Sequence, residues 1–500
     1  MAKNQMQNLA KETAIYGVSS ILGKFLNWLL VPLYTYVLTG SADYGAVANL
    51  YAWTALLLVI LTYGMETGFF RFANKHIEIA DKVYGNTLIS VGTTSLIFAL
   101  LCVVFAQPIA NVLGYADHPE YIAMLGVVVA MDAFGSIPFA YLRFSSRPIK
   151  FAALKLLMIF TNIIFNIFFL VLCPIIHEKA PESIAWFYNP NYGVGYVFVA
   201  NVIQTVVVTL ALLPEVFKAK FEFDFPLLKQ ILRYSLPLLI LGIAGIMNQT
   251  LDKIIFPFLI EDPVLAKSEL GIYSACFKIS MVMMMFTQAF RYAYEPFIFA
   301  QYKDKNSKAA YADAMKFFII FSLLIFLGMM FYLDIFKYVL HSDYWAGLRI
   351  IPIVLFSYIF QGVFFNLSLW YKLIDKTMYG AWFALAGAVI TIAGNIIFVP
   401  IFSYMASAWV SFACFFVMML LSYFYGQKHM PIQYDLKSIG SYTALALALY
   451  AISFFVKTPF VALNLTIKTL LLAIFVIYLV KKDLPLSSIP VVRKFMKKRD

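Results

Sequence analysis

The sequence places ionisable side chains inside segments that are otherwise long and apolar. Charge at the centre of a membrane-spanning helix costs at least about 2.5–3.5 kcal/mol per residue, so such residues usually mark a pair or a functional site. Around a wet cavity, lysine and arginine would bind an anion, because arginine holds a phosphate with two parallel hydrogen bonds and lysine offers a compact charge. The bases are Lys24, Lys155, Lys253, Lys278, Arg291, Arg349 and Lys468, and the acids are Glu66, Asp132, Asp252 and Glu295.

Lys24 belongs to a narrow polar stripe on one predicted helix. Gly17, Ser20, Lys24 and Asn27 recur at helical spacing. Lipid would not tolerate this stripe, so we expect it to face a water-filled cavity. Lys278 shares a helix face with Ser274 further along the chain.

Other polar positions gather on repeat-related segments and complete the predicted site. The cationic, substrate-binding set is Lys24, Lys253, Lys278 and Arg291, and the neutral polar set is Ser20, Asn27, Asn248, Gln249 and Gln288. Ion pairs for coupling or gating are predicted at Glu66, Arg71, Asp252 and Glu295. Such a cavity would suit an anionic solute, and the acids would carry a coupling proton or sodium ion if one is used.

Simpler readings of these charges stay open. Lys155 and Arg349 lie near span ends and are expected to snorkel to the interface, while Asp132 has no nameable partner. The four predicted gate residues could equally be structural salt bridges. The four cysteines lack metal or redox spacing, and no catalytic set or phosphate-binding loop occurs, so we expect no metal, no cofactor and no enzymatic activity.

The composition decides the class of protein that must position these residues. Of 500 residues, 62% are hydrophobic and 13% are charged, and the mean hydropathy is +0.82. Soluble domains are about 45–50% apolar and about 25% charged, so a cytosolic enzyme, a secreted domain and a disordered chain are excluded. The long, continuous apolar runs do not favour an outer-membrane barrel, whose strands alternate apolar and polar residues. The net charge of +12 has no basic soluble domain to carry it, so nucleic acid is not an expected partner.

The sequence therefore predicts an all-α polytopic membrane protein with about fourteen spans, because helices satisfy the backbone in lipid. The spans lie near residues 15–38, 46–70, 84–106, 120–142, 151–173, 194–213, 232–258, 270–297, 315–333, 347–370, 378–401, 403–426, 438–456 and 459–480. With the amino terminus inside, the inside segments hold 27 lysines and arginines and the outside segments hold four. This bias predicts that both termini are cytoplasmic.

A weak internal repeat relates the two halves. Pro32 matches Pro257, and the Asp-Tyr-Gly ending at Gly45 matches the Glu-Leu-Gly ending at Gly271. Six spans separate the copies, which predicts two six-helix bundles related by a pseudo-two-fold axis, plus a C-terminal pair. The predicted parts are bundles at 1–213 and 232–426, a cytoplasmic linker at 214–231, and at 427–500 the helix pair with a basic tail.

Several motifs resemble bacterial polysaccharide flippases of the multidrug/oligosaccharidyl-lipid/polysaccharide exporter superfamily. The resemblance extends over almost the whole chain and rests on the order and spacing of the motifs. They are AIYGVSSILGK at 14–24, YGMETGFFRF at 63–72, IPFAYLR at 137–143 followed by Arg147 and Pro148, LGIY at 270–273 and AFRYAYEPF at 289–297.

This resemblance implies a transporter that rocks between inward and outward states. It implies that the protein flips undecaprenyl-pyrophosphate-linked oligosaccharide units for surface polysaccharide or O-antigen, in the bacterial inner membrane, alongside other polysaccharide-assembly membrane proteins. The family carries cations in its central cavity, which fits Lys24, Lys278 and Arg291. A flippase for a peptidoglycan precursor, a cation-coupled multidrug antiporter and a membrane glycan polymerase or ligase are the alternatives.

Overall fold

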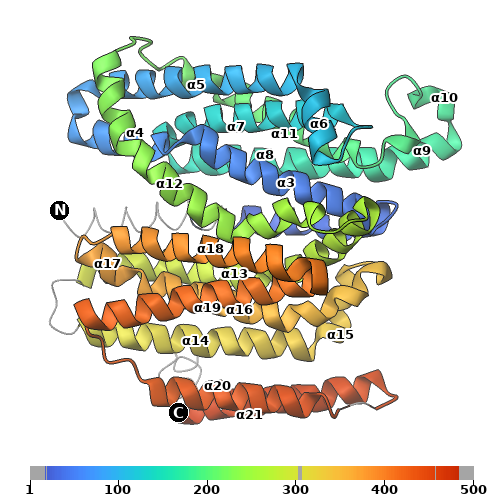
Figure 1. Cartoon of the computed structure of the whole chain (residues 1–500), viewed down its shortest axis with the longest axis vertical. Helices are drawn as coiled ribbons and strands as arrows, with labels where there is room; N and C mark the ends of the chain where they lie inside the picture. Colours follow the sequence, from blue (N-terminus) through green and yellow to red (C-terminus); the bar gives the residue numbers. More distant parts are fainter. Residues whose placement is uncertain (1–16, 18–19, 302–306, 457, 484–500) are drawn as a thin grey trace, which may run out of the picture.

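The computed structural model describes residues 17, 20–301, 307–456 and 458–483, without the side chains of residues 293, 295–301 and 307. Within these ranges the chain forms helices and turns and no strand. Figure 1 shows two bundles stacked on one another, the N-terminal half in blue to green above the C-terminal half in yellow to orange. The predicted all-α fold with two bundles is confirmed.

The N-terminal half follows the predicted order of spans. Residues 20–28 are helical and a turn at Leu29 leads into the next helix. The elements are α2 (Leu30–Val37), α3 (Ser41–Thr62), α4 (Met65–Lys75), η1 (Ile77–Ile79), α5 (Ala80–Val104), α6 (Ala106–Leu113), α7 (Pro119–Phe144), α8 (Pro148–Ile167), η2 (Phe168–Leu172), α9 (Cys173–Lys179), α10 (Pro181–Ile184), η3 (Pro190–Tyr192) and α11 (Gly195–Val216).

The C-terminal half and the terminal pair complete the chain. The half contains α12 (Phe225–Ile255), η4 (Phe256–Phe258), α13 (Pro263–Gln301), α14 (Ser307–Phe331), α15 (Leu333–Phe336), η5 (Lys337–Val339), η6 (Ser342–Ile350), α16 (Ile351–Leu367), α17 (Leu369–Leu373), α18 (Met378–Phe402) and α19 (Tyr404–His429). The pair consists of α20 (Leu436–Ser453) and α21 (Val461–Lys482).

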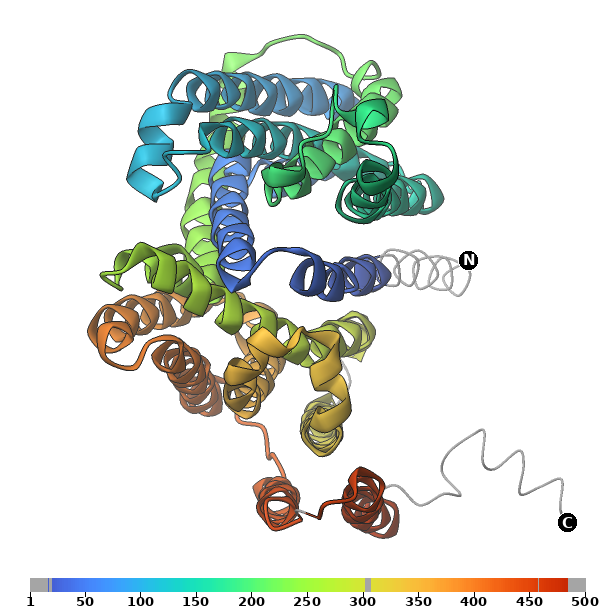
Figure 2. The same ribbon diagram turned by 90° about the vertical axis from the view of Figure 1, so that its right-hand side faces the viewer.

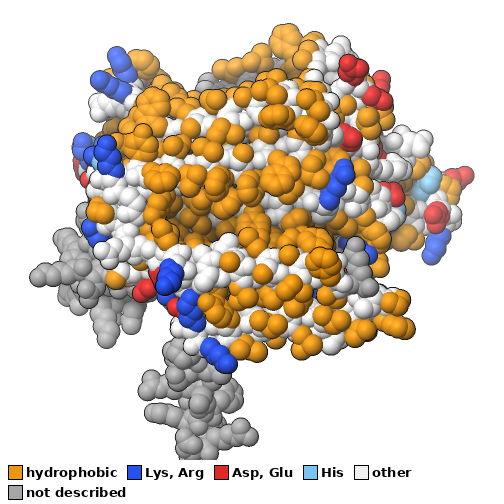
Figure 3. All heavy atoms as spheres, turned by 60° about the horizontal axis from the view of Figure 1, so that its bottom comes forward, with side chains coloured by type: hydrophobic (Ala, Val, Ile, Leu, Met, Phe, Trp, Pro, Cys, Tyr) orange, Lys and Arg blue, Asp and Glu red, His pale blue; other side chains and the backbone are white. Residues whose placement is uncertain are grey.

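Twelve helices in the described ranges are long and apolar enough to cross a membrane. The first of the fourteen predicted spans is described only in part, and the thirteenth corresponds to α20, which is not among the twelve. Figure 3 shows the lateral surface as a wide hydrophobic band with charged side chains gathered toward its ends. This distribution suits helices that cross a bilayer.

The second predicted span is not one continuous helix. Tyr63 and Gly64 both adopt left-handed backbone conformations, with φ of 32° and 71°, and separate α3 from α4. A Cβ on Gly64 would lie 2.7 Å from the carbonyl oxygen of Ser235 in α12. The break therefore occurs where two backbones approach too closely for any side chain at Gly64.

Two glycines mark a close approach of the halves. A Cβ on Gly45 of α3 would collide with the carbonyl oxygen of Lys267, and one on Gly271 of α13 would collide with that of Ser41. Each added Cβ would also lie 3.0 Å from the other glycine's amide nitrogen. This reciprocal pattern is what a two-fold axis produces between equivalent surfaces, so the axis passes between Gly45 and Gly271.

The segment between the halves is fastened to α5. The amide of Asn86 donates to the carbonyl of Glu222 at 3.1 Å and accepts from the N–H of Asp224 at 2.9 Å. Asp224 caps α12 by accepting from the Leu227 N–H, and Lys82 lies 2.9 Å from its carboxylate. The Leu227 N–H and the Lys82 ammonium lower the pKa of Asp224 below its ordinary value.

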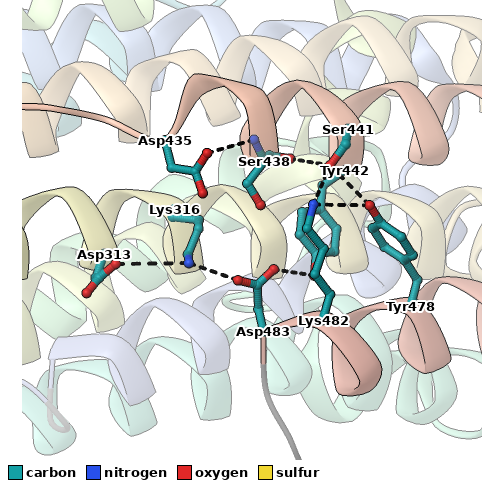
Figure 4. A network of polar contacts seen from close by, with 9 residues as sticks. All are labelled: Asp313, Lys316, Asp435, Ser438, Ser441, Tyr442, Tyr478, Lys482 and Asp483. Atoms are coloured by element: carbon teal, nitrogen blue, oxygen red, sulfur yellow. Dashed lines mark hydrogen bonds and ion pairs between the residues drawn. The ribbon is translucent and has the colours of Figure 1, made fainter.

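The terminal pair packs against α14 and lies to one side of the C-terminal half (Figure 2). Figure 4 shows the contacts near its end: Lys316 lies 2.9 Å from Asp483, whose other oxygen accepts from Tyr442 at 2.7 Å. Burial raises the pKa of Asp483, but the hydrogen bonds from Lys316 and Tyr442 outweigh it and leave that pKa below its ordinary value. A second ion pair, Lys468 with Asp334 at 2.8 Å, joins α21 to α15.

Candidate functional site

A cavity of about 470 Å³ lies between the two halves. Its polar lining comes from both bundles and is rich in amides, hydroxyls and tyrosines. From the N-terminal half these residues are Asn27, Tyr34, Tyr44, Tyr51, Asp132, Asn162, Asn201 and Gln204; from the C-terminal half they are Asn248, Gln249, Thr250, Lys253, Ser274, Lys278, Ser357, Tyr358, Gln361 and Ser411.

Five predicted site residues line this cavity, namely Asn27, Asn248, Gln249, Lys253 and Lys278. The structure thus brings together the polar patches predicted on three separate spans. Asn248 is 5% exposed, donates to the carbonyl of Ala384 at 3.0 Å, and its side-chain oxygen has no hydrogen-bond partner among the described residues. That oxygen is buried beside Gly387 of α18, where a Cβ added to the glycine would lie 3.1 Å from it.

Lys278 is the cation most available to a ligand. Its side chain is exposed and borders the cavity, and its ammonium group makes no hydrogen bond or ion pair with any residue that the structure describes. Lys253 repels it electrostatically. Two nearby positive charges with one left unpaired form a site that an anion would stabilise.

Lys253 is already committed to a buried acid. Its ammonium lies 2.8 Å from Asp252 and 4.0 Å from the centre of the Phe277 ring. Asp252 is 3% exposed and also accepts a 2.6 Å hydrogen bond from the Tyr273 hydroxyl. Asp252, one of the predicted gate residues, therefore forms an ion pair with Lys253 of the same helix.

Lys24 and Gln288 lie away from the cavity lining and contact each other instead. The Lys24 ammonium donates to the Gln288 side-chain oxygen at 2.8 Å, and Trp28 donates to the carbonyl of Lys278, also at 2.8 Å. The first predicted span thus packs along α13, where it joins the two halves. Ser20 is half-buried on this span and is likewise absent from the lining.

Arg291, Glu66 and Arg71 are also absent from the cavity lining. Arg291 is exposed and its guanidinium lies 5.3 Å from the centre of the Phe365 ring. Glu66 pairs with Arg143, and Arg71 lies over the Tyr234 ring at 4.1 Å. The side chain of Glu295 falls outside what the structure describes.

The predicted set omitted a wall of neutral amides and one acid. Asn162, Asn201 and Gln204 line the cavity beside Asp132, which accepts a 3.4 Å hydrogen bond from Thr205. Asn201 also donates to the Tyr51 hydroxyl. Amides inside otherwise apolar helices were the available signal, because each must find a polar partner or water.

The family can now be assigned from comparison with known proteins. A family model described as "Polysaccharide biosynthesis protein" matches residues 9–299, more than half of the chain. The chain belongs to this polysaccharide biosynthesis protein family. A second model, MatE, matches residues 259–397. A search of curated proteins finds no significant match.

Solved structures of the MOP superfamily share the fold of this polysaccharide biosynthesis protein. A structure titled "Lipid II flippase MurJ, inward closed conformation" has a TM-score of 0.73 at 13% identity, covering 94% of this chain and 99% of that one. An inward-facing multidrug resistance MATE transporter has a TM-score of 0.65 at 14% identity, covering 81% and 94%. The family model confirms the resemblance to the polysaccharide branch, and the chain shares the fold of solved flippases and transporters. The twelve candidate spans among its described residues make it a multi-pass membrane protein.

A third solved structure also shares the fold. It is a MOP superfamily transporter from Pyrococcus furiosus whose title reports reverse polarity of the binding pocket, with a TM-score of 0.59 at 13% identity, covering 84% of this chain and 95% of that one. At this identity the likeness shows the fold alone. The charge of this chain's cavity is set by its own lining residues.

Proposed function

We propose that the protein flips undecaprenyl-pyrophosphate-linked oligosaccharide repeat units from the cytoplasmic to the outer face of the bacterial inner membrane. The product would serve surface polysaccharide or O-antigen biosynthesis. The observation that carries this proposal is Lys278, an unpaired cation at the wall of a polar cavity between two symmetry-related bundles. In a lipid-linked sugar, the diphosphate is the anionic group that such a site would bind.

The cavity addresses the physical barrier to flipping. A diphosphate and several sugars cannot enter hydrocarbon without losing their hydration, which costs far more than thermal energy. Amides such as Asn162 and Gln204 can replace water around the sugars, and Lys278 can replace counterions around the diphosphate. The polyprenyl chain would stay in the lipid while the headgroup crosses.

The symmetry of the halves supports an alternating-access mechanism. In the proposed orientation both termini are cytoplasmic, so the contact of Gly45 with Gly271 closes the outer end of the cavity. The headgroup would enter from the cytoplasmic side, and the halves would then rock apart at these glycines. The rocking units would be residues 1–213 and 232–426, with 214–231 as the cytoplasmic linker and 427–500 as the terminal pair and tail.

Transport of a fluorescent polyprenyl-pyrophosphate sugar in proteoliposomes tests the proposal. We expect the wild type to move the lipid, Lys278→Ala to lose at least about tenfold in rate, and Lys278→Arg to recover part of it, since one charge–phosphate contact contributes about 1.5–3 kcal/mol. Lys229→Ala, which removes an exposed lysine on α12, is the matched control. Full activity in Lys278→Ala, Lys24→Ala and Arg291→Ala would contradict the cationic site.

A peptidoglycan-precursor flippase is the nearest alternative, because its substrate carries the same diphosphate. The structure titled as a lipid II flippase shares this fold. Adding an unlabelled peptidoglycan precursor to the transport assay separates the two: strong competition at equal concentration would favour the alternative. Export of cationic dyes without lipid transport would favour a multidrug antiporter.

A further inference from the structure

The two walls of the cavity carry charges of opposite sign. Among the described residues that line it, the N-terminal half contributes one ionisable acid, Asp132 of α7, and no base. The C-terminal half contributes two bases, Lys253 of α12 and Lys278 of α13, and no acid. A ligand that bridges the halves therefore meets a positive wall on one side and a negative charge on the other.

The other polar side chains of the cavity wall around Asp132 include neutral amides. Asn162 of α8 and Gln204 of α11 are 7% and 5% exposed, yet both border the cavity. The Asn162 oxygen accepts from Asn166 at 2.9 Å, and the Gln204 amide donates to Thr205 at 3.3 Å. Each retains a further donor or acceptor for a ligand, because an amide has two N–H groups and two lone pairs.

A cation lies behind Asp132 rather than in front of it. Lys155 interacts electrostatically with Asp132, but its ammonium lies 4.1 Å from the centre of the Phe139 ring and is absent from the cavity lining. Glu66 and Arg143, which also act on Lys155, pair with one another. The side of Asp132 that faces the cavity thus presents an acceptor and a negative charge.

We propose that Asp132 makes the protein select sugars by charge. This inference rests on the proposed function and adds an orientation: the diphosphate lies toward Lys278, and the first sugars lie against α7, α8 and α11. Hydroxyl and acetamido groups can donate to Asp132 and exchange hydrogen bonds with Asn162 and Gln204. An ammonium sugar gains from the carboxylate, whereas a sugar carboxylate is repelled by it.

Three lipids that differ at one position of the sugar test this selection. Each is the same polyprenyl diphosphate, carrying glucose, glucosamine or glucuronate, and binding is measured on the full-length protein in nanodiscs. We expect the glucosyl and glucosaminyl lipids to bind at least about tenfold more tightly than the glucuronosyl lipid, the scale of one partly screened like-charge contact.

Variants locate the source of the discrimination. Asp132→Asn is expected to reduce the glucose-to-glucuronate ratio of affinities to within about threefold, and Lys278→Met to weaken all three lipids by a similar factor. Asp81→Asn, which removes an exposed acid at the start of α5, should leave the ratio unchanged. If Asp132→Asn does not fold, Asn201→Asp adds an acid to the same wall and should widen the ratio instead.

The outcomes separate this inference from the function beneath it. Equal binding of all three lipids to the wild type, or a ratio that Asp132→Asn does not change, would overturn the selection by charge while leaving lipid transport intact. Failure of every lipid to bind would instead count against the proposed function. Tightest binding of the glucuronosyl lipid would show that the sugars face the lysines and reverse the orientation.

Discussion

The side-chain oxygens of Ser41 and Ser268 lie 2.6 Å apart and join α3 to α13 across the pseudo-two-fold axis. They lie about one turn from Gly45 and Gly271, where the backbones of the halves approach closely. A rocking motion that opens this end must separate the two serines. The pair is therefore a direct reporter of the closed state.

A disulfide between these positions should stop the transport cycle. In Ser41→Cys/Ser268→Cys, oxidation is expected to cross-link the halves, because side chains in hydrogen-bond contact lie within disulfide reach. Lipid transport should fall to background and return on reduction. The four native cysteines are buried and unpaired, so each single-cysteine variant serves as the control. Undiminished transport by a fully cross-linked protein would show that this end does not open.

Replacing Ser235 by alanine should restore stability to one of two neighbouring glycine-to-alanine variants and not to the other. A Cβ on Gly68 would collide with the Ser235 hydroxyl oxygen, whereas one on Gly64 would meet the Ser235 carbonyl oxygen at 2.7 Å. We expect Gly68→Ala and Gly64→Ala each to cost about 1–3 kcal/mol of stability. Ser235→Ala should recover part of the loss in Gly68→Ala only, since it leaves the carbonyl in place. Thermal unfolding of the single and double variants measures this, and equal rescue of both would refute the assignment.

The two cavity lysines should differ in their effect on stability. Lys253→Met leaves the buried carboxylate of Asp252 without its ion-pair partner, and we expect a loss of about 3–5 kcal/mol. Lys278→Met removes a charge that Lys253 repels, so the protein without ligand should be as stable as the wild type or more so, while transport is lost. Melting temperatures in detergent and transport rates give both readouts, with Lys229→Met as control. Greater destabilisation by Lys278→Met would contradict the pairing described above.

Asp224, which caps α12, should make the stability of the protein depend on pH in the acid range. Because the folded-state pKa of Asp224 is lowered, its contribution is present above the unfolded-state pKa of about 3.9 and is lost as pH falls through the folded value. Asp224→Asn should lower the melting temperature at neutral pH by roughly 1–3 °C and flatten its fall below pH 4. Asp81→Asn is the matched control. An unchanged acid profile in Asp224→Asn would mean that other carboxylates govern this range.

The positions of most spans followed from hydropathy alone. Residues 378–401 were predicted and α18 covers Met378–Phe402, because a run of apolar residues in lipid can satisfy its backbone only as a helix. The break at Tyr63 and Gly64 was not predicted. A single glycine in an apolar run does not reveal the Ser235 carbonyl that approaches it from α12.

Helix periodicity predicted the site residues that lie on the cavity-facing side of their own helix. Asn27 and Lys278 line it as expected, but Lys24 meets Gln288 because the rotation of a neighbouring helix decides which face is covered. Glu215 likewise shows that the sequence does not reveal contacts between residues far apart in the chain. It is fully buried between Lys150 at 2.5 Å and Lys218 at 2.7 Å, and only Lys218 is near it in sequence.

The last two helices are attached to one side of the C-terminal bundle. Ion pairs join this pair to the bundle through Asp483, which contacts Lys316 of α14, and through Lys468 of α21, which contacts Asp334 of α15, so we expect the pair to move with that bundle. Any tilt of that bundle therefore sweeps an area of bilayer wider than the bundle itself. The thickness and stiffness of the surrounding lipid then become part of the energetic barrier to each turnover.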